Sequence, residues 1–166
     1  MMMIDVASAD LLPGEARKFS FTVTADSLDL GEDISSYRGK VRVEGAVLDT
    51  GAVYRVIGTI WAVRNFICDR CLAEGKREST CDFSEDYAKT PGEADGTGSC
   101  DGETIVLDDL VRDTLLMAEP LRELCKSDCK GLCPVCGCNL NEGTCGCDTF
   151  VPDPRLAALE SLRKND

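Results

Sequence analysis

The sequence predicts an α+β protein. A mainly antiparallel β-sheet, of meander or barrel-like form, packs against one helix and precedes a loop-rich, cysteine-stapled C-terminal module. Three features of the 166-residue chain support this fold class. Apolar residues alternate along several segments of the first half, helical spacing follows near residue 110, and seven of the 11 cysteines fall between Cys125 and Cys147. Period-two alternation is typical of strands, and recurrence every three to four residues is typical of helices.

The strand pattern is strongest in the first half of the chain. Residues 19–23 carry an apolar side chain at every second position, which predicts a strand. Two longer alternating runs, residues 41–47 and 54–67, flank an Asp-Thr-Gly sequence at residues 49–51. That sequence suits a hairpin turn, because glycine accepts a positive φ. Residues 74–87 predict a more polar strand at a sheet edge, and we expect these segments to form an antiparallel meander.

Glycines mark the irregular parts of this pattern. Gly45 and Gly58 lie inside the predicted strands, where glycine indicates a bulge or a close approach of two backbones. Before the first strand, the stretch around Pro13 and Gly14 predicts a loose segment. Residues 89–102 are rich in glycine and acidic side chains and predict a flexible loop.

One helix is predicted between the acidic loop and the cysteine-rich region. A short strand at residues 104–107 precedes it, and Asp108 or Asp109 is expected to cap its first turn. The helix spans residues 108–119 and ends at Pro120, since proline does not continue a helix. Its apolar residues recur at helical spacing, so we expect them to pack on the sheet.

The composition divides the chain at the end of this helix. Residues 1–119 form the predicted β-rich domain, and residues 120–166 form the cysteine-rich module with a short C-terminal helix. Asp153 can cap that last helix. Pro154 suits its first turn, where a missing N–H costs nothing.

Charge and composition narrow the class of protein. The formal net charge is −12 and the chain has no histidine, so metal ligands must be thiolates or carboxylates. No stretch reaches the roughly 20 apolar residues of a membrane helix. The N-terminus shows no secretory signal, so we expect no membrane contact and a cytoplasmic location. In the cytoplasm, thiols stay reduced and serve metals more often than disulfides.

The cysteines of the C-terminal module have the spacing of metal ligands. Cys133 and Cys136, followed by Gly137, have the form of a zinc knuckle. Two thiolates two residues apart can reach one ion from a tight turn, and the glycine lets backbone N–H groups face the sulfurs. All-sulfur tetrahedral sites suit zinc or iron, and we expect zinc. The ion would staple a segment that cannot bury enough apolar surface to fold unaided.

The knuckle supplies two of the four ligands that a tetrahedral ion takes. The second pair comes either from the C-x-C sequence after the knuckle or from the C-x3-C sequence before it. We expect one zinc site, although this many thiols also permit a two-metal site with bridging sulfurs. The candidate ligands in the module are Cys133, Cys136, Cys145, Cys147, Cys129 and Cys125.

A separate pair, Cys68 and Cys71, closes the strand predicted at residues 54–67. It could be half of a zinc site, a redox pair, or a turn with incidental cysteines. A thioredoxin-like pair is followed by a helix, whereas the residues after Cys71 indicate a turn into another strand. Metal binding is therefore favoured over redox chemistry for this pair. Cys81 and Cys100 are assigned no role.

The cysteine motifs resemble the signature of the YceD family. The order of the predicted elements and motifs resembles that of the family along nearly the whole chain. The motifs that are specific to the family cover about fifty residues. The upstream motif corresponds to Cys68-x-Arg70-Cys71-Leu72. The C-terminal motif corresponds to residues 129–137, Asn139-Leu140-Asn141, Cys145-x-Cys147, and Asp153-Pro154-Arg155-Leu156 with Leu159.

The resemblance implies ribosome biogenesis, through accumulation of large-subunit ribosomal RNA. It implies ribosomal proteins or large-subunit precursor particles as partners, with direct RNA contact as a further option. The acidic charge favours a basic protein partner. We therefore expect a non-enzymatic factor that acts through protein or RNA binding.

Two other functions compete with this interpretation. The surplus of thiols over four allows a thiol- or metal-based redox-sensing module. An enzyme that processes ribosomal RNA is less favoured, because no nucleophile–base pair, phosphate-binding glycine loop or general base beside an open metal position is evident in the sequence.

Overall fold

The chain divides into two units in the computed structural model. The first unit comprises residues 1–67 and 74–123, and the second comprises residues 68–73 and 124–166. The composition indicated a boundary after residue 119 and kept the 68–73 loop with the β-rich domain. The residues that the structure describes are 1–7, 14–30, 36–89, 103–148 and 155.

Two expectations lie outside the described residues. Nearly all of the predicted acidic loop at 89–102 falls there, as does most of the predicted C-terminal helix with its cap at Asp153.

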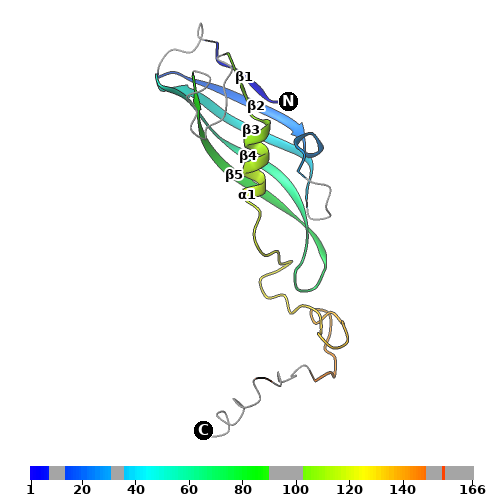
Figure 1. Ribbon diagram of the computed structural model, residues 1–166. Helices are drawn as coiled ribbons and strands as arrows, with labels where there is room; N and C mark the ends of the chain where they lie inside the picture. The colour runs from blue at the N-terminus through cyan, green and yellow to red at the C-terminus, as the bar shows by residue number, and fades with distance from the viewer. Residues whose placement is uncertain (8–13, 31–35, 90–102, 149–154, 156–166) are drawn as a thin grey trace. The chain divides into compact units, whose positions relative to one another are not determined.

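Four long strands form an antiparallel sheet in the first unit (Figure 1). They are β2 (Ala16–Thr24), β3 (Tyr37–Asp49), β4 (Val53–Ile67) and β5 (Glu74–Ala88). Each pairs with the next in sequence order, so the predicted meander is confirmed. Within the described residues, β2 and β5 are the two edge strands of this sheet. The sheet is therefore open rather than barrel-like, and β5 lies at an edge as predicted.

The β3–β4 hairpin turns on the predicted Asp-Thr-Gly sequence. Gly51 has a φ of 90°, a conformation that glycine adopts without the penalty of a side chain. The Asp49 carboxylate accepts hydrogen bonds from Lys89 Nζ at 2.6 Å and from the Gly51 N–H at 2.7 Å. The hydrogen bond from Lys89 lowers the pKa of Asp49 most, and the Gly51 N–H lowers it further. The turn is thus closed by its own acidic residue.

Gly45 and Gly58 are direct partners on the two central strands, and the predicted close approach is confirmed. A Cβ on Gly45 would lie 2.2 Å from the carbonyl oxygen of Ile57. A Cβ on Gly58 would lie 2.4 Å from that of Glu44. Both contacts are with backbone, which cannot move aside cheaply. The irregularity in the β3–β4 register lies at residues 38–42 rather than at either glycine.

The helix α1 (Asp108–Met117) lies over one face of the sheet (Figure 1). Its Val111 and Leu115 are fully buried, and the Tyr37 hydroxyl donates to the Leu115 carbonyl at 3.0 Å. The predicted packing of the helix on the sheet is therefore confirmed. The sheet contributes fully buried valine and isoleucine side chains to this core: Val41, Val43, Val47, Val56 and Ile60.

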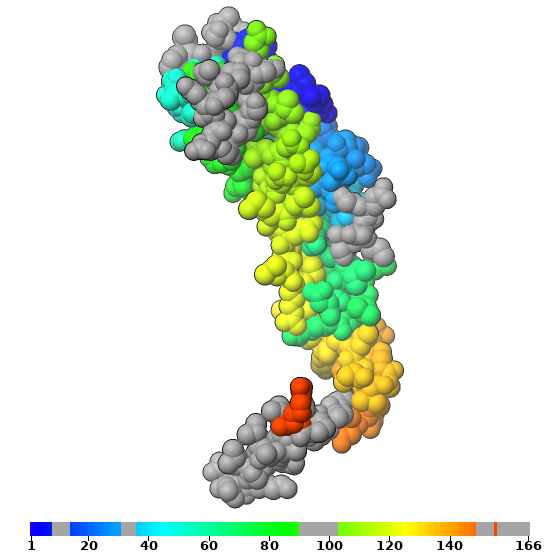
Figure 2. Space-filling model, in the orientation of Figure 1, coloured from blue at the N-terminus to red at the C-terminus, as the bar shows by residue number. Residues whose placement is uncertain are grey.

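The N-terminus is more ordered than the sequence indicated. β1 (Met3–Asp5) pairs antiparallel with β6 (Thr104–Val106), and the side chains of Met2, Ile4 and Val6 are buried. No strand was predicted for these first residues, and most of the predicted loose segment around Pro13 lies outside the described residues. Figure 2 shows the N-terminal residues (dark blue) beside the yellow-green atoms of the helix region. The cause is a short run of alternating apolar residues whose partner strand lies far along the chain.

The helix begins differently from the prediction. Leu107 occupies the N-cap position and makes no side-chain capping bond, while Asp108 and Asp109 lie in the first turn. The Asp108 carboxylate instead accepts a hydrogen bond from the Met2 backbone N–H at 3.1 Å. Acidic residues in a first turn still favour the helix, because they face the positive end of its dipole.

Among the residues that the structure describes, no helix has the length and apolar character needed to cross a membrane.

A buried ion cluster joins β4 to the segment after α1, within the first unit. Arg64 and Glu123 are each less than a tenth exposed and form a direct ion pair. Arg64 also lies 3.3 Å from Glu119, and Arg77 lies 3.0 Å from Glu123. Two arginines and two carboxylates therefore balance one another where isolated charges would be costly.

We expect Gly58→Ala to destabilise the first unit by about 1–3 kcal/mol, because its Cβ would collide with the Glu44 carbonyl. Gly75→Ala is the matched control. The three atoms nearest to its Cβ would all belong to the Phe66 ring, a side chain rather than backbone. Urea unfolding followed by circular dichroism measures both losses. An equal or greater loss in the Gly75 variant would contradict the backbone collision.

We expect Glu123→Ala to lower the free energy of unfolding by about 3 kcal/mol, because it leaves Arg64 buried beside an incomplete set of partners. Glu119→Ala, at a more exposed carboxylate that leaves the Arg64–Glu123 pair intact, should cost about 1 kcal/mol or less. Equal losses in the two variants, measured by the same unfolding experiment, would show that the buried pair has no special weight.

Candidate metal centre

The second unit contains two groups of four cysteines whose sulfur atoms all lie within 4.8 Å of one another. We call them the hairpin site and the knuckle site. The hairpin site consists of Cys68, Cys71, Cys125 and Cys129. The knuckle site consists of Cys133, Cys136, Cys145 and Cys147.

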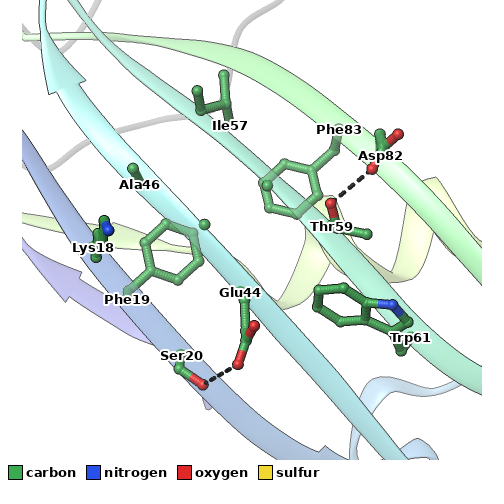
Figure 3. A pocket seen from close by; sticks show the side chains of 12 residues that line it. Lys18, Phe19, Ser20, Glu44, Ala46, Ile57, Thr59, Trp61, Asp82 and Phe83 are labelled. Carbon is green, nitrogen blue, oxygen red and sulfur yellow. Dashed lines mark hydrogen bonds between the residues drawn. The ribbon is translucent and has the colours of Figure 1, made fainter.

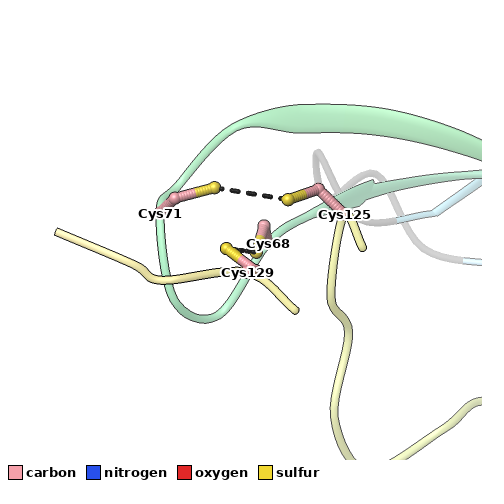
Figure 4. A group of neighbouring side chains, drawn as sticks. All are labelled: Cys68, Cys71, Cys125 and Cys129. Carbon is pink, nitrogen blue, oxygen red and sulfur yellow. Dashed lines mark hydrogen bonds between the residues drawn. The ribbon is translucent and has the colours of Figure 1, made fainter. Parts of the chain in front are cut away.

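The hairpin site joins two segments that are distant in sequence. Cys68 and Cys71 lie in the loop between β4 and β5, and the other two cysteines follow Glu123. Figure 4 shows the four side chains converging from these segments. The Cys68 and Cys129 sulfurs are 3.8 Å apart, and those of Cys71 and Cys125 are 3.6 Å apart.

Most of the hairpin site is shielded from solvent. Cys68, Cys71 and Cys129 are 0%, 7% and 1% exposed, and Leu124 and Leu132 pack against them. Cys125 is exposed as a residue, although its sulfur faces that of Cys71 (Figure 4). The site therefore combines a small apolar cluster with a thiol core.

Hydrogen-bond donors lower the pKa of two thiols in the hairpin site, and burial with neighbouring thiols raises that of a third. Burial raises the pKa of Cys68, but backbone N–H groups, first that of Cys125, outweigh it and lower the pKa to about 6. Burial also opposes ionisation of Cys129, whose pKa is nevertheless lowered, first by the Asn141 amide. Burial and the neighbouring thiols raise the pKa of Cys125 to about 12. A cation entering the group would displace that proton.

Two residues outside the thiol sets support the hairpin site. The Arg70 side chain donates from Nη1 to the Cys129 carbonyl at 2.6 Å. The Arg70 backbone carbonyl accepts a hydrogen bond from the Leu132 N–H at 3.0 Å. Asn141 donates from Nδ2 to the Cys129 sulfur at 3.4 Å, and its Oδ1 accepts the Lys130 N–H at 2.9 Å. These hydrogen bonds fix the orientation of the Cys129 segment, as outer partners of metal ligands do.

The knuckle site has the turn that its sequence predicted. Gly137 has a φ of 74°, and its N–H donates to the Cys133 carbonyl at 2.9 Å. The backbone N–H groups of Cys136 and Val135 lower the pKa of Cys133 to about 6. The Cys138 N–H is the first cause of the lowered pKa of Cys136.

Cys147 of the knuckle site is less acidic than Cys133. The hydrogen bond with Cys136, followed by burial, raises the pKa of Cys147 to about 12. Cys133 is buried, Cys136 is exposed, and Cys145 and Cys147 are half-buried. The knuckle site is therefore the more open of the two groups.

The geometry of the hairpin site fits a tetrahedral ion. An ion with metal–sulfur distances of about 2.3 Å separates its sulfurs by about 3.8 Å. The Cys68–Cys129 and Cys71–Cys125 sulfur separations, 3.8 Å and 3.6 Å, agree with that value. They are far longer than a disulfide bond of about 2.05 Å. Both groups could hold metal ions.

All eight cysteines singled out in the sequence lie in these two groups, but they pair differently from the single site that was expected. The C-x3-C pair before the knuckle joins Cys68 and Cys71, and the C-x-C pair after the knuckle joins Cys133 and Cys136. The sequence contains four closely spaced cysteine pairs, and four pairs supply the ligands of two four-thiol groups. The number of pairs was therefore the signal for two sites. Arg70 and Asn141 were given no structural role in the sequence, because their hydrogen bonds depend on the fold. Cys81 is a buried residue of the sheet core.

A hollow of about 910 Å³ on the sheet is another feature that could receive a ligand. Residues of all four long strands line it (Figure 3). Its two carboxylates are already engaged, Glu44 with Arg42 and Asp82 with the Thr59 hydroxyl at 2.7 Å. Trp61 is partly exposed at its rim, and Arg42 lies over the ring. The hollow offers a surface for contact, and the Ser20 hydroxyl in it donates to the Glu44 carboxylate at 3.4 Å.

Comparison with known proteins identifies the family. A family model described as "Large ribosomal RNA subunit accumulation protein YceD" matches residues 56–163, a span that covers more than half of the chain and contains both thiol groups. Neither the curated proteins nor the solved structures include a significant match. The resemblance seen in the cysteine motifs is therefore confirmed, and the chain belongs to the YceD family of large ribosomal RNA subunit accumulation proteins.

Proposed function

We propose that this chain is a non-enzymatic factor in large-subunit ribosome biogenesis that acts by binding, and that two zinc ions staple its cysteine-rich unit. The observation that carries the proposal is the presence of two four-thiol groups inside the region matched by the family. The family name connects the chain with accumulation of large-subunit ribosomal RNA.

Zinc is the ion that the donor set favours. Four thiolates suit zinc or iron–sulfur chemistry, and a closed four-thiolate set leaves no open position for a substrate, as in structural zinc sites. The apolar cluster of the second unit is small, with Leu124 and Leu132 packed on three cysteines. A bound ion would supply folding free energy that this cluster lacks. The thiols and their N–H donors would then serve the architecture of a binding module.

Charge favours a protein as the direct partner. The chain carries a formal net charge of −12, and each zinc ion held by four thiolates would add about two negative charges. Such a surface attracts basic proteins and repels nucleic-acid phosphate unless a local basic patch intervenes. Basic ribosomal proteins on large-subunit precursor particles are therefore the proposed contact, and cytoplasm is the proposed location.

We expect the full-length chain to carry two zinc ions in native mass spectrometry at neutral pH. The double variant Cys68→Ser/Cys71→Ser should carry one, because it removes two ligands of the hairpin site, and Cys133→Ser/Cys136→Ser should also carry one. Cys81→Ser, at a core cysteine, is the control and should keep both. A single ion in the unaltered chain would restore the one-site interpretation.

We expect the tagged full-length chain, crosslinked in cells, to enrich large-subunit ribosomal RNA precursors and basic large-subunit proteins over small-subunit components. Sequencing of the captured RNA and mass spectrometry of the captured proteins measure both. The Cys133→Ser/Cys136→Ser variant should lose the enrichment by about tenfold, if the stapled unit makes the contact. Equal recovery of the two subunits would contradict the proposal, and RNA crosslinks without protein partners would replace the protein contact by an RNA contact.

A further inference from the structure

The two metal sites differ in their access to solvent. Three of the four hairpin-site thiols are buried, and two leucines pack against them. In the knuckle site only Cys133 is buried, and Cys136 is an exposed residue. Oxidation of cysteine follows thiolate character and exposure, so a small oxidant reaches the knuckle site first.

A fifth thiol lies beside the knuckle site. Cys138 is half-buried and lies two positions after Cys136 in the chain. Its backbone holds it beside the knuckle, because the Cys138 carbonyl accepts the Cys133 N–H at 2.9 Å. Cys138 is not one of the four converging thiols, so it is free to react when a neighbouring ligand is oxidised.

We propose that Cys138 is a resolving thiol that makes the knuckle site a peroxide-releasable metal site, while the hairpin site keeps its ion. The inference rests on the proposed metal occupancy and adds a modification site to it. The surplus thiol noted in the sequence is thereby assigned to Cys138, with Cys136 as its disulfide partner.

The chemistry balances with a peroxide as the oxidant. The Cys136 thiolate attacks one peroxide oxygen, the O–O bond breaks, and the leaving hydroxide takes a proton to become water, which leaves a sulfenic acid on Cys136. The Cys138 thiol then attacks the oxidised sulfur, a disulfide forms, and the second oxygen departs as water. Two thiols are oxidised and one peroxide is reduced to two waters. The ion loses a ligand and is released, and a thiol reductant restores the site.

The hairpin site lacks this combination in the described residues. Its thiols are mostly buried, and in the sequence no further cysteine lies within two residues of any of them. Cys125, its exposed member, has its sulfur directed at Cys71 (Figure 4). Oxidation there should therefore be slower.

The test treats zinc-loaded full-length protein with one equivalent of hydrogen peroxide. Released zinc is followed with a chromogenic chelator, and the ions that remain are counted by native mass spectrometry. We expect one of two ions to be released, a disulfide between Cys136 and Cys138 in peptide mapping, and recovery after a thiol reductant with added zinc. Cys138→Ser should start with two ions and release the first roughly tenfold more slowly. Cys81→Ser, the control, should behave as the unaltered chain.

Different results would contradict the metal proposal and the role of Cys138. A chain with no metal before oxidation overturns the metal proposal and this inference together. Two ions that leave at the same rate, or release that is unchanged in Cys138→Ser, overturn this inference alone. Loss of one ion from untreated Cys138→Ser would make Cys138 a ligand and also overturn its role as the resolving thiol.

Discussion

The convergence of cysteine sulfurs is the constraint on which the second unit depends. Within the described residues its apolar cluster contains little beyond Leu124 and Leu132, so hydrophobic burial there is too small to order so many turns. The turns instead point backbone N–H groups at the sulfurs, as the low pKa of Cys68 and Cys133 records. The same contacts that stabilise thiolates therefore fix the path of the chain, and thiol chemistry and local fold are inseparable in this unit.

The sheet was predictable because its information is local. Alternating residues and the turn at Gly51 define the β3–β4 hairpin within a few residues, and the Gly45–Gly58 pair marks a close approach that only glycine allows. The β1–β6 pairing was missed because its partners lie about a hundred residues apart, beyond the reach of periodicity. The capping error has the same origin, since Asp108 is engaged by the N–H of Met2, a contact that exists only in the fold.

The cysteine site was predictable in its members and not in its grouping. Close spacing identifies pairs such as Cys133 with Cys136, because a tight turn brings both sulfurs to one point. Which pairs share a group depends on where the segments meet. The loop carrying Cys68 and Cys71 meets the chain that follows α1, and no property of either segment alone reports this. Supporting residues such as Arg70 are hidden for the same reason, because their hydrogen bonds cross between segments.

The two sites join cysteines over different sequence separations, and this affects the order in which they can form during folding. The knuckle site uses residues 133–147 only, so an unfolded full-length chain can form it from a short stretch before the rest has folded. In the hairpin site the Cys71–Cys125 contact spans 54 residues, which include β5, β6 and α1. Closing so long a loop carries an entropic cost that the intervening elements reduce by folding first. Occupancy of the hairpin site would thus act as a checkpoint for completed folding, whereas occupancy of the knuckle site would not.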